Sequence, residues 1–305
     1  MDHNRTTAIA TLFVIGTGSL WGFYWIPVRH LAASGLSGAW GTLAIVTMAT
    51  LVLTPLAVRA RHRLLRSSPV ALASIALGGV AFVLYSVSLV YGRVAIVVLL
   101  FFLTPVWSTL IARYVMGWPT PWLRMVAIMV GVTGLGVVLG ADGGLPLPQG
   151  LGDWLGLGSG MLWAIATTGI RSQPETGPGE AAFIFALGAC VGAAMLAPAF
   201  EPLPNSAAGA ILPAFGWALV TGTLWWGLSM VCLMWATARL EPARVGILLM
   251  AEVLVGVAST AAIAGEGLSP VEVVGGLLVL GAGILEVWPV RRADPAGADA
   301  VRAPQ

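Results

Sequence analysis

The sequence contains no lysine and little charge of any kind. Only 9% of its 305 residues are charged, whereas a soluble domain carries about 25%. The mean hydropathy is +0.92, and 58% of the residues are hydrophobic. A water-soluble surface cannot be built from so few charged side chains. The composition therefore excludes a soluble globular protein and indicates an integral membrane protein.

Histidine and cysteine are also scarce. His3, His30 and His62 all lie outside the long apolar stretches, which disfavours a metal site or histidine acid/base chemistry in the membrane. Cys190 and Cys232 lie inside apolar stretches, so no disulfide framework is implied. The sequence has neither a P-loop nor an aspartate-rich motif for Mg²⁺ and pyrophosphate. We therefore expect no cofactor, no metal and no enzymatic activity.

Ten long apolar runs follow one another along the chain. They cover residues 8–28, 38–58, 69–92, 94–112, 125–141, 154–170, 181–200, 206–238, 245–265 and 271–290. A membrane-spanning helix needs about 20 mostly apolar residues, so each run fits one span. The first run ends in bulky aromatic residues, unlike a removable signal peptide. We predict an all-α integral membrane protein with ten transmembrane helices.

The fifteen arginines are distributed unevenly between the loops. With the N-terminus in the cytoplasm, only Arg29 and Arg93 would lie outside. The other thirteen would lie inside: Arg5, Arg59, Arg61, Arg63, Arg66, Arg113, Arg124, Arg171, Arg239, Arg244, Arg291, Arg292 and Arg302. Positive residues in short loops stay on the cytoplasmic side. We predict a multi-pass protein of the bacterial inner membrane with both termini cytoplasmic and residues 291–305 as a tail.

The first and sixth apolar runs repeat one another. Gly16-Thr-Gly-Ser-Leu-Trp21 is followed by Arg29, and Gly158-Ser-Gly-Met-Leu-Trp163 is followed by Arg171 at the same spacing. The offset between the two copies is 142 residues. Because five helices separate the copies, the second enters the membrane from the opposite side. This is the inverted repeat of many secondary transporters.

A second match joins the fourth and ninth runs. Arg93-Val-x-Ile96 recurs as Arg244-Val-x-Ile247, at an offset of 151. A shift by one helical turn instead pairs Gly117 with Gly265, so the register stays open. The two matches predict a first five-helix repeat over 8–141 and a second, inverted one over 152–290.

These motifs resemble the drug/metabolite transporter superfamily, and in particular its ten-helix exporters with two EamA-type domains. The resemblance spans about residues 8–290. Its carriers are Leu20-Trp21, Leu162-Trp163, Leu103-Thr-Pro-Val106, Ala251-Glu252, Gly265-Glu266, Ser269-Pro270 and the glycines after Gly275. Val253 stands where family members often have proline, and Trp118 where an acidic residue is common. The resemblance implies export of metabolites, and the aromatic content is similar to that of bacterial aromatic amino-acid exporters.

Polar and aromatic side chains form stripes on several of the apolar runs. Polar groups avoid lipid, so we expect these stripes to face the interior of the bundle. The candidate substrate-binding residues are Trp21, Tyr24, Tyr85, Phe101, Thr104, Trp163, Thr167 and Ser229, together with Glu252. Rings and hydroxyl groups suit a zwitterion with an aromatic side chain. Structural packing is the alternative for Trp21, Trp163 and Tyr85.

Glu252 is the one ionisable residue deep inside a predicted span. A charged side chain there costs roughly 2.5 to 3.5 kcal/mol on insertion scales, so an unpaired structural role is disfavoured. Three roles remain open. Glu252 is a protonatable coupling group, a contact for the ammonium of the substrate, or a neutral acid hydrogen-bonded between helices.

The sequence thus predicts a secondary transporter that exports amino acids, aromatic ones first, by alternating access. Export of hydrophobic drugs or other metabolites is the alternative within the same class, and a membrane enzyme or sensor is the alternative outside it. The expected partners are a small-molecule substrate and membrane lipid, without nucleic acid. We expect a monomer or a weak homo-oligomer.

Overall fold

The computed structural model describes residues 3–117, 121–141, 143–171, 176–204, 208–237, 239–240 and 242–287. All regular secondary structure within these ranges is helical. The first half of the chain comprises α1 (His3–Gly22), α2 (Trp25–Ala33), α3 (Ala39–Arg59), α4 (Arg61–Leu64), α5 (Pro69–Tyr91), α6 (Val94–Phe101), α7 (Thr104–Tyr114) and α8 (Trp122–Leu139). The second comprises α9 (Leu151–Arg171), α10 (Pro178–Phe200), α11 (Ala208–Thr221), η1 (Gly222–Ser229), α12 (Met230–Thr237), α13 (Pro242–Leu249), α14 (Ala251–Ser259), η2 (Thr260–Ala264) and α15 (Pro270–Val287).

Eight helical segments of the described chain are long and apolar enough to cross a membrane. They are Arg5–Ala33, Ala39–Arg59, Pro69–Tyr91, Val94–Tyr114, Trp122–Leu139, Pro178–Phe200, Leu212–Thr237 and Arg244–Ala264. These segments confirm the prediction of a multi-pass helical membrane protein.

Two of the ten predicted spans are helical but fall outside this set. The run 154–170 forms α9, whose Asp153 and whose glycine, serine and threonine residues lower its hydropathy. The run 271–290 forms α15, in which Pro270–Leu285 is a shorter apolar helix. A count of ten therefore stays a prediction.

Three predicted spans are interrupted by a break in the helix. The first breaks between α1 and α2, the fourth between α6 and α7, and the ninth between α13 and α14. Pro105, in the first turn of α7, lacks an N–H and explains the break in the fourth. No proline lies at the break around Met250, where the chain tightens so that the Met250 N–H donates to the Ile247 carbonyl.

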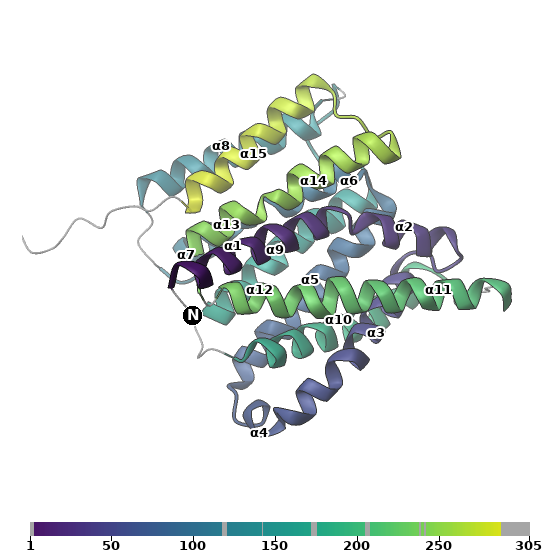
Figure 1. Ribbon diagram of the computed structural model, residues 1–305. Helices are drawn as coiled ribbons and strands as arrows, with labels where there is room; N and C mark the ends of the chain where they lie inside the picture. The colour runs from purple at the N-terminus through teal and green to yellow at the C-terminus, as the bar shows by residue number, and fades with distance from the viewer. Residues whose placement is uncertain are drawn as a thin grey trace, which may run out of the picture.

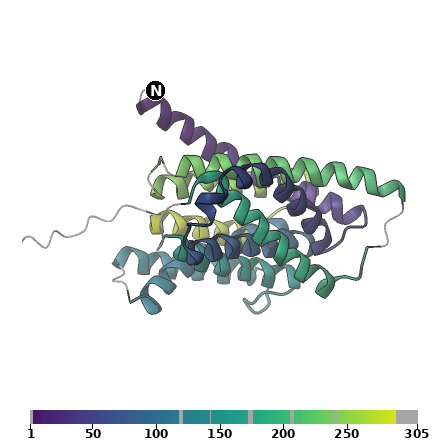
Figure 2. The ribbon, with the colours of Figure 1, turned by 90° about the horizontal axis from the view of Figure 1, so that it is seen from below.

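The helices pack in a compact set of pairs, which Figures 1 and 2 show from two directions. α5 lies against α9 and α10, and α3 lies against α10. α1 lies against α12, α13 and α14, and α8 pairs with α15 at the upper side of Figure 1. Glycines permit the closest approaches: a methyl group on Gly134 would lie 2.8 Å from the carbonyl oxygen of Gly275.

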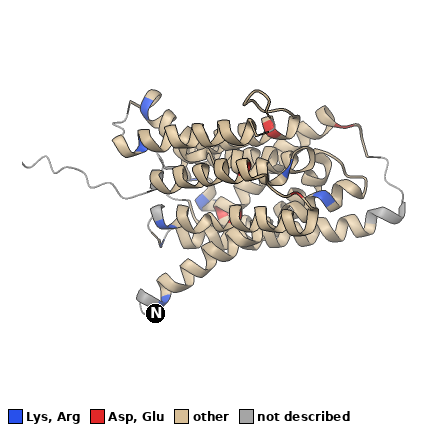
Figure 3. Ribbon diagram, turned by 90° about the horizontal axis from the view of Figure 1, so that it is seen from above, with Lys and Arg blue, Asp and Glu red and all other residues tan. Residues whose placement is uncertain are grey.

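Charged residues separate toward the two ends of the bundle. Figure 3 shows blue arginine segments gathered at the end that carries the N-terminus and α4. We call this the Arg63 end. The opposite end, here called the Arg29 end, holds Arg29 and Arg93 together with acidic partners. The separation follows the arginine pattern of the sequence.

Candidate functional site

A cluster of aromatic rings fills the interior between the two halves of the chain. We call it the aromatic cage. Its members are Trp21, Tyr24, Phe82, Tyr85, Phe101, Trp163, Phe185 and Trp226. They come from α1 and the turn after it, α5, α6, α9, α10 and η1. The cage therefore joins segments that are up to two hundred residues apart in sequence.

Five of the predicted site residues belong to this cage. The ring centroids of Trp21 and Tyr24 lie 4.8 Å apart, and those of Tyr85 and Phe101 also lie 4.8 Å apart. Trp163 joins them through Phe82, at 5.1 Å. All of these rings are buried except that of Trp163, which is half-buried. The stripes read from the sequence thus face a common interior.

Phe82 lies at the centre of the cage, and sequence reasoning missed it. α5 is apolar along most of its length, so its hydropathy does not show which apolar side chain points to the middle. Phe185 was missed for the same reason, because α10 is rich in alanine, glycine and phenylalanine. Only the packing of the helices distinguishes these rings from others.

Polar groups lie at the rim of the cage. The Trp21 indole N–H donates to Ser229 Oγ at 3.0 Å, and the Ser229 hydroxyl donates to the Trp225 carbonyl. The Tyr85 hydroxyl donates to Glu252 Oε1 at 3.0 Å, which connects α5 to the start of α14. Glu252 is buried, as are Tyr85 and Ser229. A substrate in the cage would thus meet a carboxyl group and hydroxyl groups beside the rings.

A second polar chain passes behind Tyr24. The Trp226 indole N–H donates to the Tyr24 hydroxyl at 3.0 Å, and this hydroxyl lies 3.0 Å from Ser86 Oγ. Ser86 Oγ lies 2.7 Å from Thr42 Oγ1 on α3. Ser86 and Thr42 were not among the predicted residues, since Ser86 follows Tyr85 directly and lies on another face of α5. These hydrogen bonds fix the orientation of the Tyr24 ring.

The π-helix η1 explains how two consecutive tryptophans reach the same neighbouring segment. The wider turn leaves Trp225 and Trp226 both directed at the first span. The Trp225 indole N–H donates to the Leu20 carbonyl at 2.8 Å, while that of Trp226 reaches Tyr24. Both side chains are buried.

Two glycines lie against the helix breaks. A methyl group on Gly160 of α9 would be 2.8 Å from the Phe101 carbonyl oxygen, where α6 ends. A methyl group on Gly18 of α1 would be 3.4 Å from the Leu249 carbonyl oxygen, where α13 ends. Gly18 and Gly160 are the copies related by the offset of 142. Each copy therefore contacts the break in a different half of the chain.

The two predicted threonines lie outside the ring contacts. Thr104 Oγ1 donates to the Phe101 carbonyl at 2.6 Å and also lies 3.3 Å from the Gly160 carbonyl oxygen. Thr104 thus holds the break between α6 and α7 against α9. Thr167 Oγ1 bonds to the Trp163 and Ala164 carbonyls of its own helix. Neither hydroxyl is directed into the cage by these bonds.

Ion pairs tie the halves together at the Arg29 end. Arg29 Nη1 lies 2.6 Å from Glu266 Oε1, and the guanidinium also donates to the Leu89 and Gly92 carbonyls. Glu266 Oε2 accepts the backbone N–H of Val94 at 2.9 Å. We call these groups the Arg29 latch. Beside it, Arg93 lies 2.5 Å from Glu272.

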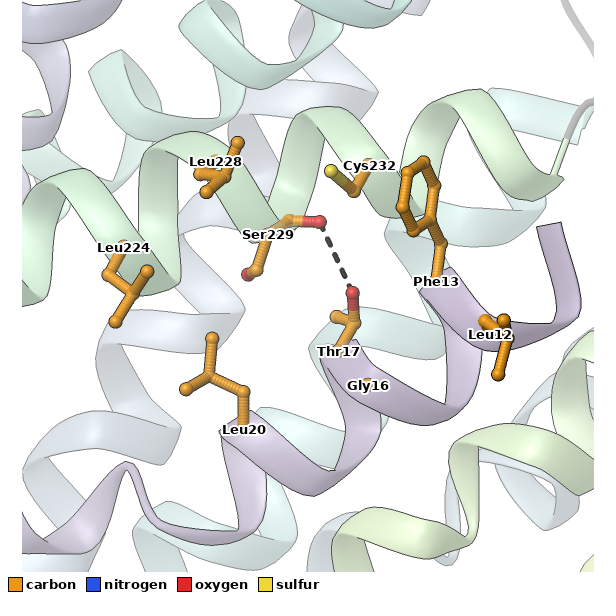
Figure 4. A pocket seen from close by; sticks show the side chains of 9 residues that line it. All are labelled: Leu12, Phe13, Gly16, Thr17, Leu20, Leu224, Leu228, Ser229 and Cys232. Carbon is orange, nitrogen blue, oxygen red and sulfur yellow. Dashed lines mark hydrogen bonds between the residues drawn. The ribbon is translucent and has the colours of Figure 1, made fainter. Parts of the chain in front are cut away.

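A pocket of about 180 Å³ lies outside the cage, between α1 and the η1–α12 segment (Figure 4). It is lined by Leu12, Phe13, Gly16, Thr17, Leu20, Leu224, Leu228, Ser229 and Cys232. Leu12 and Leu228 are largely exposed, so the pocket opens on the outer face of the bundle. The Thr17 hydroxyl lies 3.5 Å from the Ser229 carbonyl at its inner wall. Ser229 therefore borders both the pocket and the cage.

The described residues contain no group of three His, Cys, Asp or Glu side chains placed to hold a metal ion. Cys190 and Cys232 are both free thiols. The polar chemistry of the interior rests instead on Glu252 and on hydroxyl and indole groups.

Apolar helices with breaks around a buried polar and aromatic centre are typical of multi-pass membrane proteins. Residues 8–140 match the model of the EamA-like transporter family. The match to a family of transporters suggests a membrane transporter of small molecules. Among curated proteins, none matches the chain significantly.

Solved structures share the fold. Fourteen chains match significantly. One of them, a crystal structure, aligns with a TM-score of 0.58 over 96% of this chain and 99% of its own, at 17% identity. At this identity the likeness concerns the fold alone.

Proposed function

We propose that the protein is a secondary transporter that exports amino acids, aromatic ones first, across the bacterial inner membrane by alternating access. The observation that carries the proposal is the aromatic cage with Glu252 and Ser229 at its rim. An aromatic amino acid needs rings around its side chain, a carboxylate near its ammonium, and hydroxyl or backbone groups near its carboxylate. The rings of the cage and the side chains at its rim offer each of these groups.

Breaks in the helices support the transporter mechanism. Discontinuous helices at the bundle centre expose backbone groups where a substrate binds, and a break lies beside Tyr24, Phe101 and Glu252. The EamA-type match of residues 8–140 supports the same class. Membrane enzymes and sensors are the competing class.

The proposal includes two inverted five-helix repeats, residues 8–141 and 152–290. Support comes from the equivalent contacts of Gly18 and Gly160 with the helix breaks. Gly117 and Gly265, which follow the fourth and ninth spans, have φ of 68° and 69°. This likeness favours the register that pairs these glycines, an offset of 148, over the offset of 151. In that register Thr104 and Glu252 are counterparts.

The proposed orientation places the Arg63 end in the cytoplasm and the Arg29 end outside. Arginines gather at the former, where the positive-inside rule expects them. The side chain of Arg171 is not described, and Arg291, Arg292 and Arg302 lie outside the described residues, as does the whole tail at 291–305. Their placement rests on the sequence alone.

The test is counterflow in proteoliposomes that contain the purified protein. Radiolabelled phenylalanine, tryptophan, methionine and threonine are offered outside vesicles preloaded with the same unlabelled amino acid. We expect accumulation of phenylalanine and tryptophan above that of threonine. Protein-free vesicles provide the background, and a variant with Trp163 replaced by alanine provides a matched protein control. Absence of movement for the whole panel would contradict the amino-acid assignment.

Export of a hydrophobic drug is the second candidate, and the pocket in Figure 4 favours it. The pocket opens toward lipid, is mostly apolar, and exceeds the roughly 150 Å³ of a cavity that accepts benzene. A lipid-soluble substrate would enter from the membrane through this pocket and pass Ser229. Competition of an uncharged aromatic compound with phenylalanine in the same counterflow assay separates the two. Transport of the compound without any amino-acid movement would establish the second candidate.

A further inference from the structure

Phe82 contacts six other aromatic rings. Its partners, with ring centroids 5.1 to 6.3 Å away, are Trp21, Tyr85, Phe101, Trp163, Phe185 and Trp226. The interplanar angles lie between 63° and 87°, so every contact is edge-to-face. This is a favoured geometry for aromatic pairs. The phenyl group of Phe82 thus occupies the centre of the cage.

The same neighbours connect this central position to the polar rim. Trp21 is hydrogen-bonded to Ser229, and Tyr85 is hydrogen-bonded to Glu252. A ring at the position of Phe82 therefore lies next to the two side chains that lead to a hydroxyl and a carboxyl group. That is the arrangement an aromatic amino acid requires, with its ring in the centre and its charged groups at the rim.

The backbone that carries Phe82 is held in place. A side chain on Gly79 would collide with the Phe185 carbonyl of α10, and one on Gly78 would lie 2.8 Å from the Trp163 ring. α5 is therefore in tight contact with α9 and α10 just one turn before Phe82. The Phe82 ring has to leave the centre by rotation of its own side chain rather than by a shift of α5.

We propose that the Phe82 side chain occupies the substrate-ring position of the aromatic cage when the cage is closed and empty, and that it rotates away when a transported ring enters. Phe82 is then a specificity-determining residue, because the incoming ring must replace a phenyl group in contacts shaped for one. The proposal rests on the proposed export of aromatic amino acids. In it, the Phe82 side chain competes with the aromatic ring of the substrate for one position in the cage.

An internal competitor lowers the apparent affinity for substrate by the fraction of molecules in which the position is free. Removal of the phenyl ring should therefore strengthen substrate binding, whereas removal of an ordinary packing residue should weaken it. We expect Phe82→Ala to lower the half-saturating concentration of phenylalanine in counterflow by about tenfold. The direction of this change separates the proposal from a purely structural role.

Phe185→Ala is the matched control. It removes the same side chain from the same buried cluster, but Phe185 contacts only Phe82, Trp163 and Trp226 among the described rings. We expect no gain in affinity from this variant. An unchanged or higher half-saturating concentration in Phe82→Ala, with transport intact in the wild type, would overturn the proposal and leave the transport function standing. If Phe82→Ala does not fold, Phe82→Leu removes the ring with less loss of volume and is expected to change affinity in the same direction.

A second measurement does not depend on transport. Indole is added to the purified variants, and the melting temperature is recorded. We expect indole to stabilise Phe82→Ala by several degrees, clearly more than Phe185→Ala, and to leave the wild type unchanged. Equal stabilisation of the two variants, or none, would count against the central ring position. The indole measurement can be interpreted even if the wild type transports no amino acid. That absence of transport would reject the proposed function but not the central ring position.

Discussion

Glu252 is the residue on which the chemistry of the interior depends most. Its side chain is buried, and the Tyr85 hydroxyl donates to it at 3.0 Å. One hydroxyl group does not compensate a full charge in an apolar span. The ammonium group of a bound substrate would compensate the negative charge of Glu252, so this charge would have a partner only when substrate is bound. Of the three roles open to Glu252, this one uses both the rings and the carboxyl group.

Glu252→Gln should raise the half-saturating concentration for phenylalanine exchange. The amide keeps the shape and can still accept the Tyr85 hydrogen bond, but it loses a charge-assisted bond of about 1.5–3 kcal/mol, which corresponds to on the order of tenfold to a hundredfold in affinity. Counterflow with and without an imposed pH gradient measures this. We expect the gradient to change nothing in the wild type. Intact exchange with loss of a gradient response would instead identify Glu252 as a coupling group, and an unaltered variant would make it a neutral helix contact.

We expect each of three alanine variants to reduce transport while the protein still inserts in the membrane. They are Trp21→Ala, Tyr85→Ala and Trp163→Ala. Because Trp21 and Tyr85 are almost fully buried, their truncation also leaves cavities and costs about 3–5 kcal/mol of stability for a large aromatic side chain. Trp21→Phe and Tyr85→Phe are therefore the sharper variants, since they keep the ring and remove the hydrogen bond to Ser229 or Glu252. Normal counterflow in all of these variants would return the three residues to a packing role.

At the scale of helices, the sequence predicted where the spans lie but only some of their interruptions. Pro105 indicates the break between α6 and α7 because proline removes an N–H. Met250 carries no comparable signal, and its break is visible only in the structure. The predicted site residues followed from polar stripes, which is why Trp21, Tyr85 and Ser229 were found. Phe82 and Phe185 were not, since their position depends on how apolar helices pack.

Gly18 and Gly160 offer a test of the two helix contacts. Because a methyl group on Gly160 would lie 2.8 Å from the Phe101 carbonyl oxygen, Gly160→Ala should destabilise the protein by about 1–3 kcal/mol through overpacking. Gly18→Ala meets ordinary contact distances of 3.4 Å and should change the melting temperature little. If the halves exchange conformations during transport, both variants should slow exchange, because each contact tightens in one state. Fast exchange in Gly18→Ala would argue against equivalent halves.

Viewed as a whole, the molecule is fastened differently at its two ends. The Arg29 latch and the pair of Arg93 with Glu272 join the spans of both halves at one end. At the other end Arg63 lies 3.4 Å from Glu180 and is mostly exposed, which makes a weak ion pair. Figure 2 also shows the N-terminal part of α1 rising away from the bundle. The described state is closed more firmly at the Arg29 end.

Opening of the Arg29 end should follow from loss of the latch. In a variant with Cys190 and Cys232 replaced by serine, a cysteine is introduced at Val97, which is fully buried. We expect Arg29→Gln to accelerate its labelling by a water-soluble maleimide added from outside. Arg63→Gln, which removes the ion pair of the opposite end, is the matched control and should leave this labelling rate unchanged. Equal rates for the two variants would show that the latch does not govern access.

The orientation of the bundle is tested by reporter fusions. Fusions after residue 64 and at the C-terminus should report a cytoplasmic location, and a fusion after residue 146 should report an external one. The reason is the arginine distribution, which places α4 inside. An external C-terminus would mean an odd number of spans and would remove the basis for inverted repeats.

The Arg29 latch also makes the transporter sensitive to the medium it faces. The side chains of Arg29 and Glu266 are 28% and 20% exposed, and that of Arg93 is 43% exposed, so dissolved ions reach these pairs. At physiological ionic strength charges are screened over about 8 Å, and over about 3 Å at 1 M. The seam between α1 and α12, lined mainly by apolar side chains, has no comparable dependence. In the proposed orientation, a saline environment would ease opening toward the outside, and the rate of efflux would rise with the ionic strength of the habitat.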